Sequence, residues 1–196
     1  QIIVLCESLY SMDGDYAPLI QFRKLCDNFK ALLYVDEAHS FFALNELGEC
    51  EASGVRADFM LFTLSKAVGG YGAVLLADEA TRDFLINKAR ALIYSTAIAP
   101  VNAAWANFVL NTDFSSRREN LRKNVEFLAL SRSQIAPFIC KNSASALNLS
   151  KKLLEHGYFI PPLRPPTVKE PRLRISLRAD IETYKLAKLK EILNEI

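Results

Sequence analysis

The sequence predicts an α/β fold, in which part of a large three-layer domain is followed by a small α+β C-terminal domain. Three observations favour it: apolar runs of strand length recur through the first half, helical patterns separate them, and the second half mixes helices with short strands. Of the 196 residues 51% are apolar and 23% are charged, which is typical of a globular chain with a sizeable core. We expect one domain over residues 1–110 and the other over 111–196.

The first half contains four short apolar runs bounded by turn-forming residues. Runs this continuous are typical of strands that helices cover on both faces. The predicted strands are residues 2–6, 31–35, 58–64 and 72–77. Apolar residues over 19–29 recur at intervals of three and four, which predicts a helix, and Asp78 is suited to cap a further helix that extends to about Leu92.

The second half predicts helices and strands in a less regular order. Pro100 is suited to start a helix that ends near Leu110, and the polar residues 111–116 form a hinge. The expected helices that follow are 117–130, 145–156 and 181–196, and the expected strands are 135–140, 158–160 and 173–177.

The charge is unevenly distributed along the chain. Residues 1–110 hold 8 basic and 13 acidic side chains, whereas residues 111–180 hold 13 basic and 6 acidic ones. The basic stretch is either an ordinary solvated surface or a face for an anionic ligand, such as the phosphates of coenzyme A or an acidic carrier protein. The net charge of +2 argues against a dedicated nucleic-acid binder.

The four cysteines form neither a C-x-x-C pair nor a zinc spacing, so we expect no metal site and a reducing, cytoplasmic environment. No apolar run reaches the roughly 18 residues that a membrane-spanning helix needs. The chain opens at Gln1 directly into an apolar run, which indicates a strand in mid-protein rather than a signal peptide. We therefore expect a fragment and no membrane partner.

Polar residues follow the second predicted strand directly, in Val35-Asp36-Glu37-Ala38-His39. Ligands of α/β sheets bind at the carboxyl ends of the strands, so Asp36 and His39 are candidates for one crevice. The alternative is a plain strand end with a capped turn. The letters Asp-Glu-Ala-His also occur in helicases, but those need a phosphate loop with a Gly-Lys pair, and this chain contains no such pair.

The third predicted strand delivers Thr63 and Lys66 onto a glycine-rich turn. A lysine that enters a crevice loses hydration, which favours the neutral amine that forms a Schiff base; a surface lysine is the alternative. With Asp36 and His39, these residues are the set that a pyridoxal phosphate site needs. The carboxylate keeps the ring nitrogen protonated, the histidine bonds the ring hydroxyl, and the threonine holds the phosphate.

Five stretches, in order, make the chain similar to the α-oxoamine synthases, fold-type I pyridoxal phosphate enzymes that condense an amino acid with an acyl thioester. The stretches are residues 7–19, Val35-Asp36-Glu37-Ala38-His39, Thr63-Leu64-Ser65-Lys66-Ala67, Ile93-Tyr94-Ser95-Thr96 and Arg164-Pro165-Pro166-Thr167-Val168. The resemblance covers nearly the whole chain. It implies that residues 1–110 form the C-terminal part of the large cofactor-binding domain.

The resemblance also implies roles for single residues. Lys66 would bond covalently to the cofactor and, together with His39, act in catalysis. Asp36 would pair with the pyridine nitrogen, and His39 and Ser11 would bond the ring hydroxyl. Thr63 would contact the phosphate.

For the phosphate and the substrates, the resemblance implies further contacts. Thr96 would reach the phosphate across the interface of a homodimer. Arg174 would bind the substrate carboxylate, since a guanidinium grips a carboxylate bidentately. Arg164 and Thr167 lie in a turn that is similar to that of members which condense L-alanine with a pimeloyl thioester, on coenzyme A or acyl carrier protein, and release CO₂. Their product is 8-amino-7-oxononanoate, a precursor of biotin.

Two alternatives stay open. One is a sibling enzyme that uses glycine or serine, of the aminoketobutyrate, aminolevulinate or ketosphinganine type. The other is a non-catalytic partner subunit, against which the presence of Lys66, Asp36 and His39 argues. Because members of the family are commonly about twice as long, we expect the 196 residues on their own to bind the cofactor weakly and to be inactive.

Overall fold

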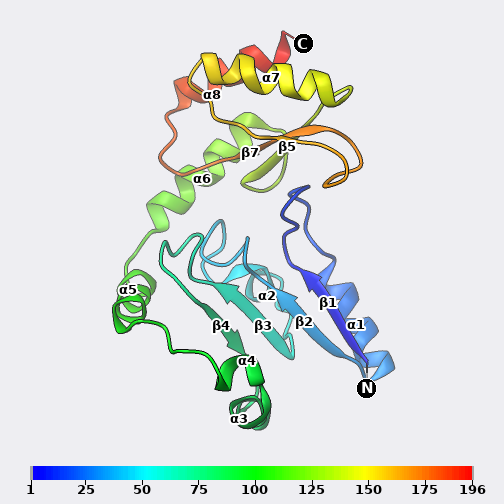
Figure 1. Cartoon of the computed structure of the whole chain (residues 1–196), viewed down its shortest axis with the longest axis vertical. Helices are drawn as coiled ribbons and strands as arrows, with labels where there is room; N and C mark the ends of the chain where they lie inside the picture. Colours follow the sequence, from blue (N-terminus) through cyan, green and yellow to red (C-terminus); the bar gives the residue numbers. More distant parts are fainter. Residues whose placement is uncertain (1, 196) are drawn as a thin grey trace. The chain divides into compact units, whose positions relative to one another are not determined.

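A computed structural model describes residues 2–195, which form two units (Figure 1). The first unit holds the described residues up to Leu9 together with Tyr16–Asp113, and the second holds Tyr10–Asp15 and the chain from Phe114 onward. The predicted boundary at residue 110 differs from this division in two respects. The chain passes from the first unit into the second after Asp113. The short segment Tyr10–Asp15 also lies in the second unit, although the rest of that unit begins only at Phe114.

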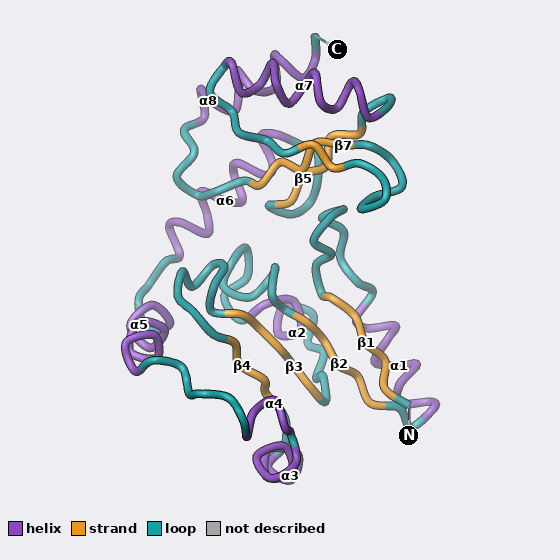
Figure 2. Tube along the Cα trace, viewed as in Figure 1, coloured by secondary structure: helices purple, strands orange, loops and turns teal. Residues whose placement is uncertain are grey.

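The first unit is built on a four-stranded sheet of order β1-β2-β3-β4, drawn in orange in Figure 2. The strands are β1 (Ile3–Glu7), β2 (Leu32–Asp36), β3 (Phe59–Thr63) and β4 (Ala73–Leu76). The first three are parallel, and β4 runs antiparallel to β3. Each strand agrees with its predicted range to within about one residue at either end.

Helices α1 to α5 accompany this sheet. They are α1 (Leu19–Phe29), α2 (Gly48–Ala52), α3 (Glu79–Lys88), α4 (Arg90–Ile93) and α5 (Pro100–Leu110). Asp78 caps α3 as predicted, because its side chain accepts a hydrogen bond from the backbone N–H of Thr81 at 2.7 Å. The predicted single helix to Leu92 is wrong: the backbone is extended at Ala89, and this residue separates α3 from α4.

The two faces of this sheet differ in burial within the described chain. Leu33 and Val35 of β2 are fully buried, as is Cys26 of α1, which packs on this strand. On the opposite face Ile3 and Leu5 of β1 are 50% and 70% exposed. The near-continuous apolar runs of the sequence therefore supply apolar side chains to both faces, and the described helices bury the face of Leu33 and Val35.

Cys6 of β1 lies beside Val35 on the buried face, and we expect it to make stability sensitive to alkaline pH. Burial, and secondarily the charges of Cys26 and Glu37, raise the pKa of Cys6 from 9.0 to about 11. Because the folded state holds this proton more tightly than the unfolded chain, the stabilisation is complete below pH 9 and is lost as the pH rises through 11. The urea midpoint of the full-length protein should fall over this interval, and less steeply for Cys6→Ala; identical slopes would contradict the assignment.

The second unit contains a three-stranded antiparallel sheet of order β5-β7-β6, accompanied by helices α6 to α8. The strands are β5 (Ile135–Ile139), β6 (Pro162–Leu163) and β7 (Arg172–Ser176), and the helices are α6 (Ser115–Leu128), α7 (Ser143–Glu155) and α8 (Thr183–Asn194). Its core is aliphatic: Leu128, Ile135, Leu153, Leu173 and Leu186 are at most 2% exposed. Among the helices of the described chain, none is long and apolar enough to span a membrane.

The predicted strand over residues 158–160 is wrong. Gly157 ends α7 with φ at +85°, and the backbone N–H of Tyr158 then donates to Leu153 O at 2.8 Å, so the chain still caps the helix there. Phe159 is 83% exposed. The strand pairing is made instead by β6, which lies within the proline-rich stretch.

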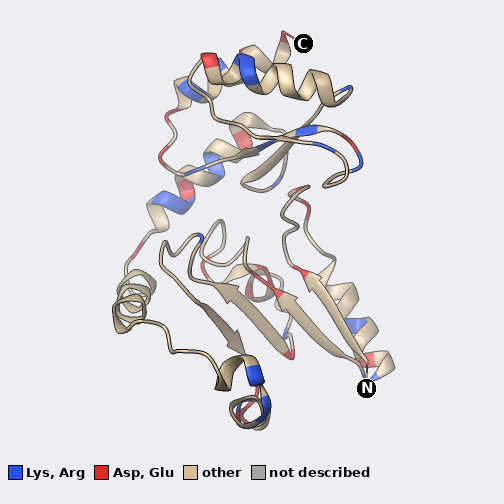
Figure 3. Cartoon of the chain, viewed as in Figure 1, with Lys and Arg blue, Asp and Glu red and all other residues tan. Residues whose placement is uncertain are grey.

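Part of the basic charge of the second unit is paired with acidic side chains. Figure 3 shows both signs on α6, where Glu119 contacts Arg122 and Lys123. Arg178 likewise pairs with Asp180 at 2.9 Å. Exposed pairs of this kind are typical of a solvated surface, which is one of the two interpretations left open by the sequence.

Candidate active site

The carboxyl ends of β1, β2 and β3 meet at one edge of the first sheet, and Asp36 and Thr63 end β2 and β3 (Figure 1). Asp36 pairs in register with Leu61, and residues two apart on a strand share a face, so Asp36 and Thr63 lie on the same face. Both are half-buried. The structure thus brings together two predicted cofactor ligands that the sequence separates by 27 positions.

Local hydrogen bonds fix both the carboxylate and the backbone of Asp36. Oδ1 accepts from the backbone N–H of Ala38 at 2.7 Å, and the Asp36 carbonyl accepts from the N–H of Ser8 at 2.9 Å. Within the described residues these contacts leave Oδ2 of Asp36 for a ligand. The turn that follows carries the half-buried His39, two residues beyond Glu37.

Lys66 lies in the turn between β3 and β4, as the sequence predicts. Its carbonyl accepts from the N–H of Gly69 at 3.0 Å, and the hydroxyl of Thr63 lies 2.7 Å from that of Ser65 and donates to Gly72 O at 3.2 Å. Lys66 was expected to lose hydration in a crevice, but within the described residues it is exposed. It lies beyond the end of β3, in a run of three exposed residues.

Thr96 lies in the exposed segment between α4 and α5, two residues after Tyr94, which is 77% exposed. A hydroxyl in such a segment is accessible to another subunit. Its predicted contact with a phosphate across a dimer interface stays a prediction.

In the second unit the structure brings Ser11 and Arg174 together. Nε of Arg174 donates to the Ser11 carbonyl oxygen at 2.5 Å, and Nη1 donates to the Ser176 hydroxyl at 2.8 Å. Burial lowers the pKa of Arg174, although a guanidinium stays charged near neutral pH. Within the described chain these bonds leave the Nη2 end of the guanidinium for a carboxylate.

Arg172 lies on the same face of β7 as Arg174 but has a different environment. Its buried side chain forms an ion pair with Asp13 through Nη1, and Nε donates to Glu170 O at 3.0 Å. Because Arg172 already has a counter-ion, Arg174 is the better candidate for binding a substrate carboxylate.

The segment Tyr10–Asp15 is fixed to the second unit by its backbone as well. The Ser133 hydroxyl donates to Gly14 O at 2.8 Å. Gly14 has φ at +69°, and a Cβ there would collide with the carbonyl oxygen of Ile135. No local sequence pattern indicates the roles of Asp13, Gly14 and Ser133, since their partners lie more than about 100 positions away in the chain.

Arg164 and Thr167 lie in the turn between β6 and β7. The N–H of Thr167 donates to Arg164 O at 3.0 Å, and both side chains are exposed, whereas Val168 is buried. The structure therefore brings these two predicted substrate contacts together in one turn.

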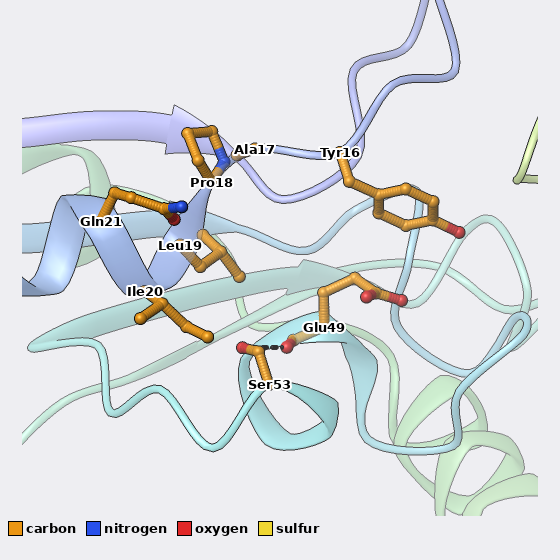
Figure 4. Close-up of a pocket in the computed structure, with 8 residues that line it drawn as sticks. All are labelled: Tyr16, Ala17, Pro18, Leu19, Ile20, Gln21, Glu49 and Ser53. Carbon is orange, nitrogen blue, oxygen red and sulfur yellow. Dashed lines mark hydrogen bonds between the residues drawn. The ribbon is translucent and has the colours of Figure 1, made fainter.

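A pocket of about 230 Å³ lies elsewhere in the first unit (Figure 4). It is lined by the first turn of α1 and by α2, through Tyr16, Ala17, Pro18, Leu19, Ile20, Gln21, Glu49 and Ser53. None of the predicted site residues lines it. Burial, with a contribution from Glu49, raises the pKa of Tyr16 to about 12, so this hydroxyl is neutral at physiological pH.

Glu37 was not predicted to have a role, although it is 0% exposed and accepts hydrogen bonds from two serine hydroxyls and two backbone amides. The two-residue period of a strand is the sequence signal that could have separated it from Asp36. It places adjacent carboxylates on opposite faces, so Asp36 and Glu37 could not both face the site.

The donor set at this edge fits a pyridoxal phosphate in its chemistry. A carboxylate with one oxygen left for a ligand suits a protonated ring nitrogen, and a primary amine in an exposed turn suits an aldehyde carbon. The hydroxyl of Thr63 suits a phosphate oxygen when its proton turns from Gly72 O toward the ligand. These three groups come from one sheet edge of the first unit.

The family model for aminotransferase class I and II matches residues 1–193. The 8-amino-7-oxononanoate synthase of Serratia marcescens is 37% identical over 213 residues, which cover 100% of this chain and 56% of that protein. The chain therefore spans about half the length of the curated relatives that it matches.

Two solved structures have the same fold over nearly the whole chain. The 8-amino-7-oxononanoate synthase of Francisella tularensis has a TM-score of 0.84 at 27% identity, covering 100% of this chain and 62% of that one. The serine palmitoyltransferase of Sphingomonas wittichii has a TM-score of 0.90 at 27% identity, covering 98% of this chain and 54% of that one. The α/β fold class is confirmed, and the chain belongs to the aminotransferase class I and II family.

Proposed function

We propose that this chain carries the catalytic lysine and the substrate-binding unit of a pyridoxal phosphate-dependent C-acyltransferase. The enzyme condenses L-alanine with a pimeloyl thioester, releases CO₂ and gives 8-amino-7-oxononanoate for biotin synthesis. The observation that carries the proposal is the placement of Asp36 and Thr63 on one face of one sheet edge, with Lys66 in the adjoining turn. The family match and the relatives named 8-amino-7-oxononanoate synthase support it.

When bound, pyridoxal phosphate supplies an electron sink for the bonds at the amino acid Cα. Lys66 would hold the cofactor through its amine, and the same amine would move the α-proton of the amino acid. Asp36 would keep a proton on the ring nitrogen through Oδ2. His39 and Ser11 would donate to the ring hydroxyl, and Thr63 would bind the phosphate.

The second unit orients the amino acid. Arg174 holds its carboxylate with the Nη2 end, while the bond from Nε to Ser11 O keeps the guanidinium in place. Arg164 and Thr167 contact the acyl substrate from their turn. In a cytoplasmic homodimer, the partner subunit's Thr96 completes the phosphate site.

The amino acid specificity is tested with the full-length protein and a pimeloyl thioester. We expect CO₂ release with L-alanine to exceed that with glycine or serine at equal concentration by at least about tenfold, the discrimination typical of one group in a pocket. The thioester is supplied both on coenzyme A and on acyl carrier protein. If the turnover rate with each of these thioesters does not change with ionic strength, this would argue against a role for the basic stretch 111–180 in binding the carrier.

A second candidate is a sibling that uses serine and a longer acyl chain. The fold similarity to serine palmitoyltransferase favours it. Higher turnover with serine and palmitoyl-CoA than with alanine and pimeloyl-CoA would establish this candidate instead. On its own the 196-residue chain is proposed to be inactive, because it spans about half the length of the relatives that it matches.

A further inference from the structure

Glu37 carries a fully buried carboxylate at the end of β2, next to the proposed cofactor ligand Asp36. Its Oε2 accepts hydrogen bonds from the hydroxyl of Ser8 at 2.8 Å and from the hydroxyl of Ser40. These two hydroxyls lie 2.5 Å from each other. The carboxylate therefore joins the residue that follows β1 to the turn that follows β2.

The same carboxylate also organises the start of α2. Oε2 accepts from the backbone N–H of Glu49 at 2.9 Å, and Oε1 accepts from that of Cys50 at 2.7 Å. At Gly48, φ is +86°, and a Cβ there would lie 2.5 Å from Oε2. Glu37 thus explains why this short, unpredicted helix begins at a glycine.

Hydroxyl and amide groups, rather than a basic side chain, contact this carboxylate within residues 2–195. A buried carboxylate is costly unless several donors satisfy it, and here four donors do. An apolar side chain at position 37 would leave these donors without their acceptor, so Glu37 is the common acceptor on which the residue after β1, the turn after β2 and the start of α2 converge.

The neighbours of Glu37 explain what the carboxylate controls. The strand period places Asp36 on the opposite face of the sheet, and the Glu37 carbonyl accepts from the N–H groups of Ser40 at 3.1 Å and Phe41 at 2.8 Å. The backbone carbonyl of Glu37 therefore closes the turn that carries His39, and the Glu37 carboxylate binds the same turn a second time through the Ser40 hydroxyl. Asp36 is the residue immediately before Glu37.

We propose that Glu37 is a positioning residue: its buried carboxylate, with Ser8 and Ser40, fixes Asp36 and His39 relative to each other so that both meet one cofactor ring. The inference rests on the proposed function and extends it to a residue that touches neither cofactor nor substrate. A displacement of about 1 Å at a reacting group costs up to about 100-fold in rate, so the loss of this anchor has a measurable consequence.

The test compares Glu37→Gln with Glu49→Gln in the full-length protein. The Glu37→Gln substitution places an amide NH₂ among hydrogen-bond donors, whereas the Glu49 side chain contacts Asn45 at 2.6 Å and lies at the pocket of Figure 4. For Glu37→Gln we expect the Kd of pyridoxal phosphate to rise about tenfold and kcat to fall by up to about 100-fold, with KM for the amino acid unchanged. The pH at which the absorbance of the bound cofactor changes should shift. Glu49→Gln should match the wild type.

Cofactor affinity and a pH titration of absorbance in Glu37→Gln that equal those of the wild type would overturn the inference. A wild-type protein that binds no pyridoxal phosphate would instead contradict the proposed function. If Glu37→Gln fails to fold, Ser40→Ala removes one donor and should shift the same titration in the same direction, and Glu37→Asp, which keeps the carboxylate, should recover part of the affinity. An unshifted titration in Ser40→Ala would also overturn the inference.

Discussion

Replacing Lys66 by Ala in the full-length protein is expected to abolish turnover, with a loss of about 10⁴-fold or more in kcat. Lys66 stands in the turn after Thr63, at the carboxyl edge that also presents Asp36. No other lysine lies between β2 and β4, so the turn of Lys66→Ala contains no second amine for the cofactor aldehyde. The visible absorption that the cofactor gains when a lysine binds it should disappear, and borohydride should no longer attach the cofactor to the chain.

Lys24→Ala is the matched control, because Lys24 is an exposed lysine on α1 and is not one of the proposed site residues. Its absorption spectrum and kcat should equal those of the wild type. Turnover in Lys66→Ala at the wild-type rate would contradict the proposed function and favour the non-catalytic partner subunit.

Replacing Arg174 by Ala is expected to raise KM for the amino acid by about 100-fold while kcat changes less, since charge-assisted hydrogen bonds to a carboxylate are each worth about 1.5–3 kcal/mol. The guanidinium is oriented by Ser11 O and the Ser176 hydroxyl, which directs Nη2 away from those two bonds. Lysine offers a point charge rather than a planar fork, so Arg174→Lys should recover little of the lost affinity. Steady-state kinetics with varied amino acid at saturating thioester measure both effects.

Arg178→Ala provides the control for this variant. Arg178 pairs with Asp180 in an exposed ion pair just beyond the end of β7, and its loss should leave KM within about twofold of the wild type. Arg172→Ala has a different expected result, a lower melting temperature, because it leaves the Asp13 carboxylate without its buried partner. Equal KM values in Arg174→Ala and the wild type would exclude Arg174 as the carboxylate ligand.

The succession of elements was predictable because it depends on local periodicity. The strands of the first sheet and helix α1 follow apolar patterns that are complete within about ten residues. Helix α2 has no such pattern: its first turn is held by the distant Glu37 carboxylate. The strand expected over residues 158–160 failed for a related reason, since the hydrogen bond of Tyr158 to Leu153 continues the preceding helix end.

The sequence by itself predicted the chemistry of the candidate site. The residue types at Asp36, His39, Thr63 and Lys66, and their positions after strands, were legible from spacing, because strand ends in an α/β sheet meet at one edge. The tertiary structure decided which of these groups already have hydrogen-bond or ion-pair partners within the chain and which remain for a ligand. Arg172 and Arg174 look alike in sequence, and only the pairing of Arg172 with Asp13, 159 positions away, separates them. Contacts between residues so far apart depend on how the chain packs, which no local pattern encodes.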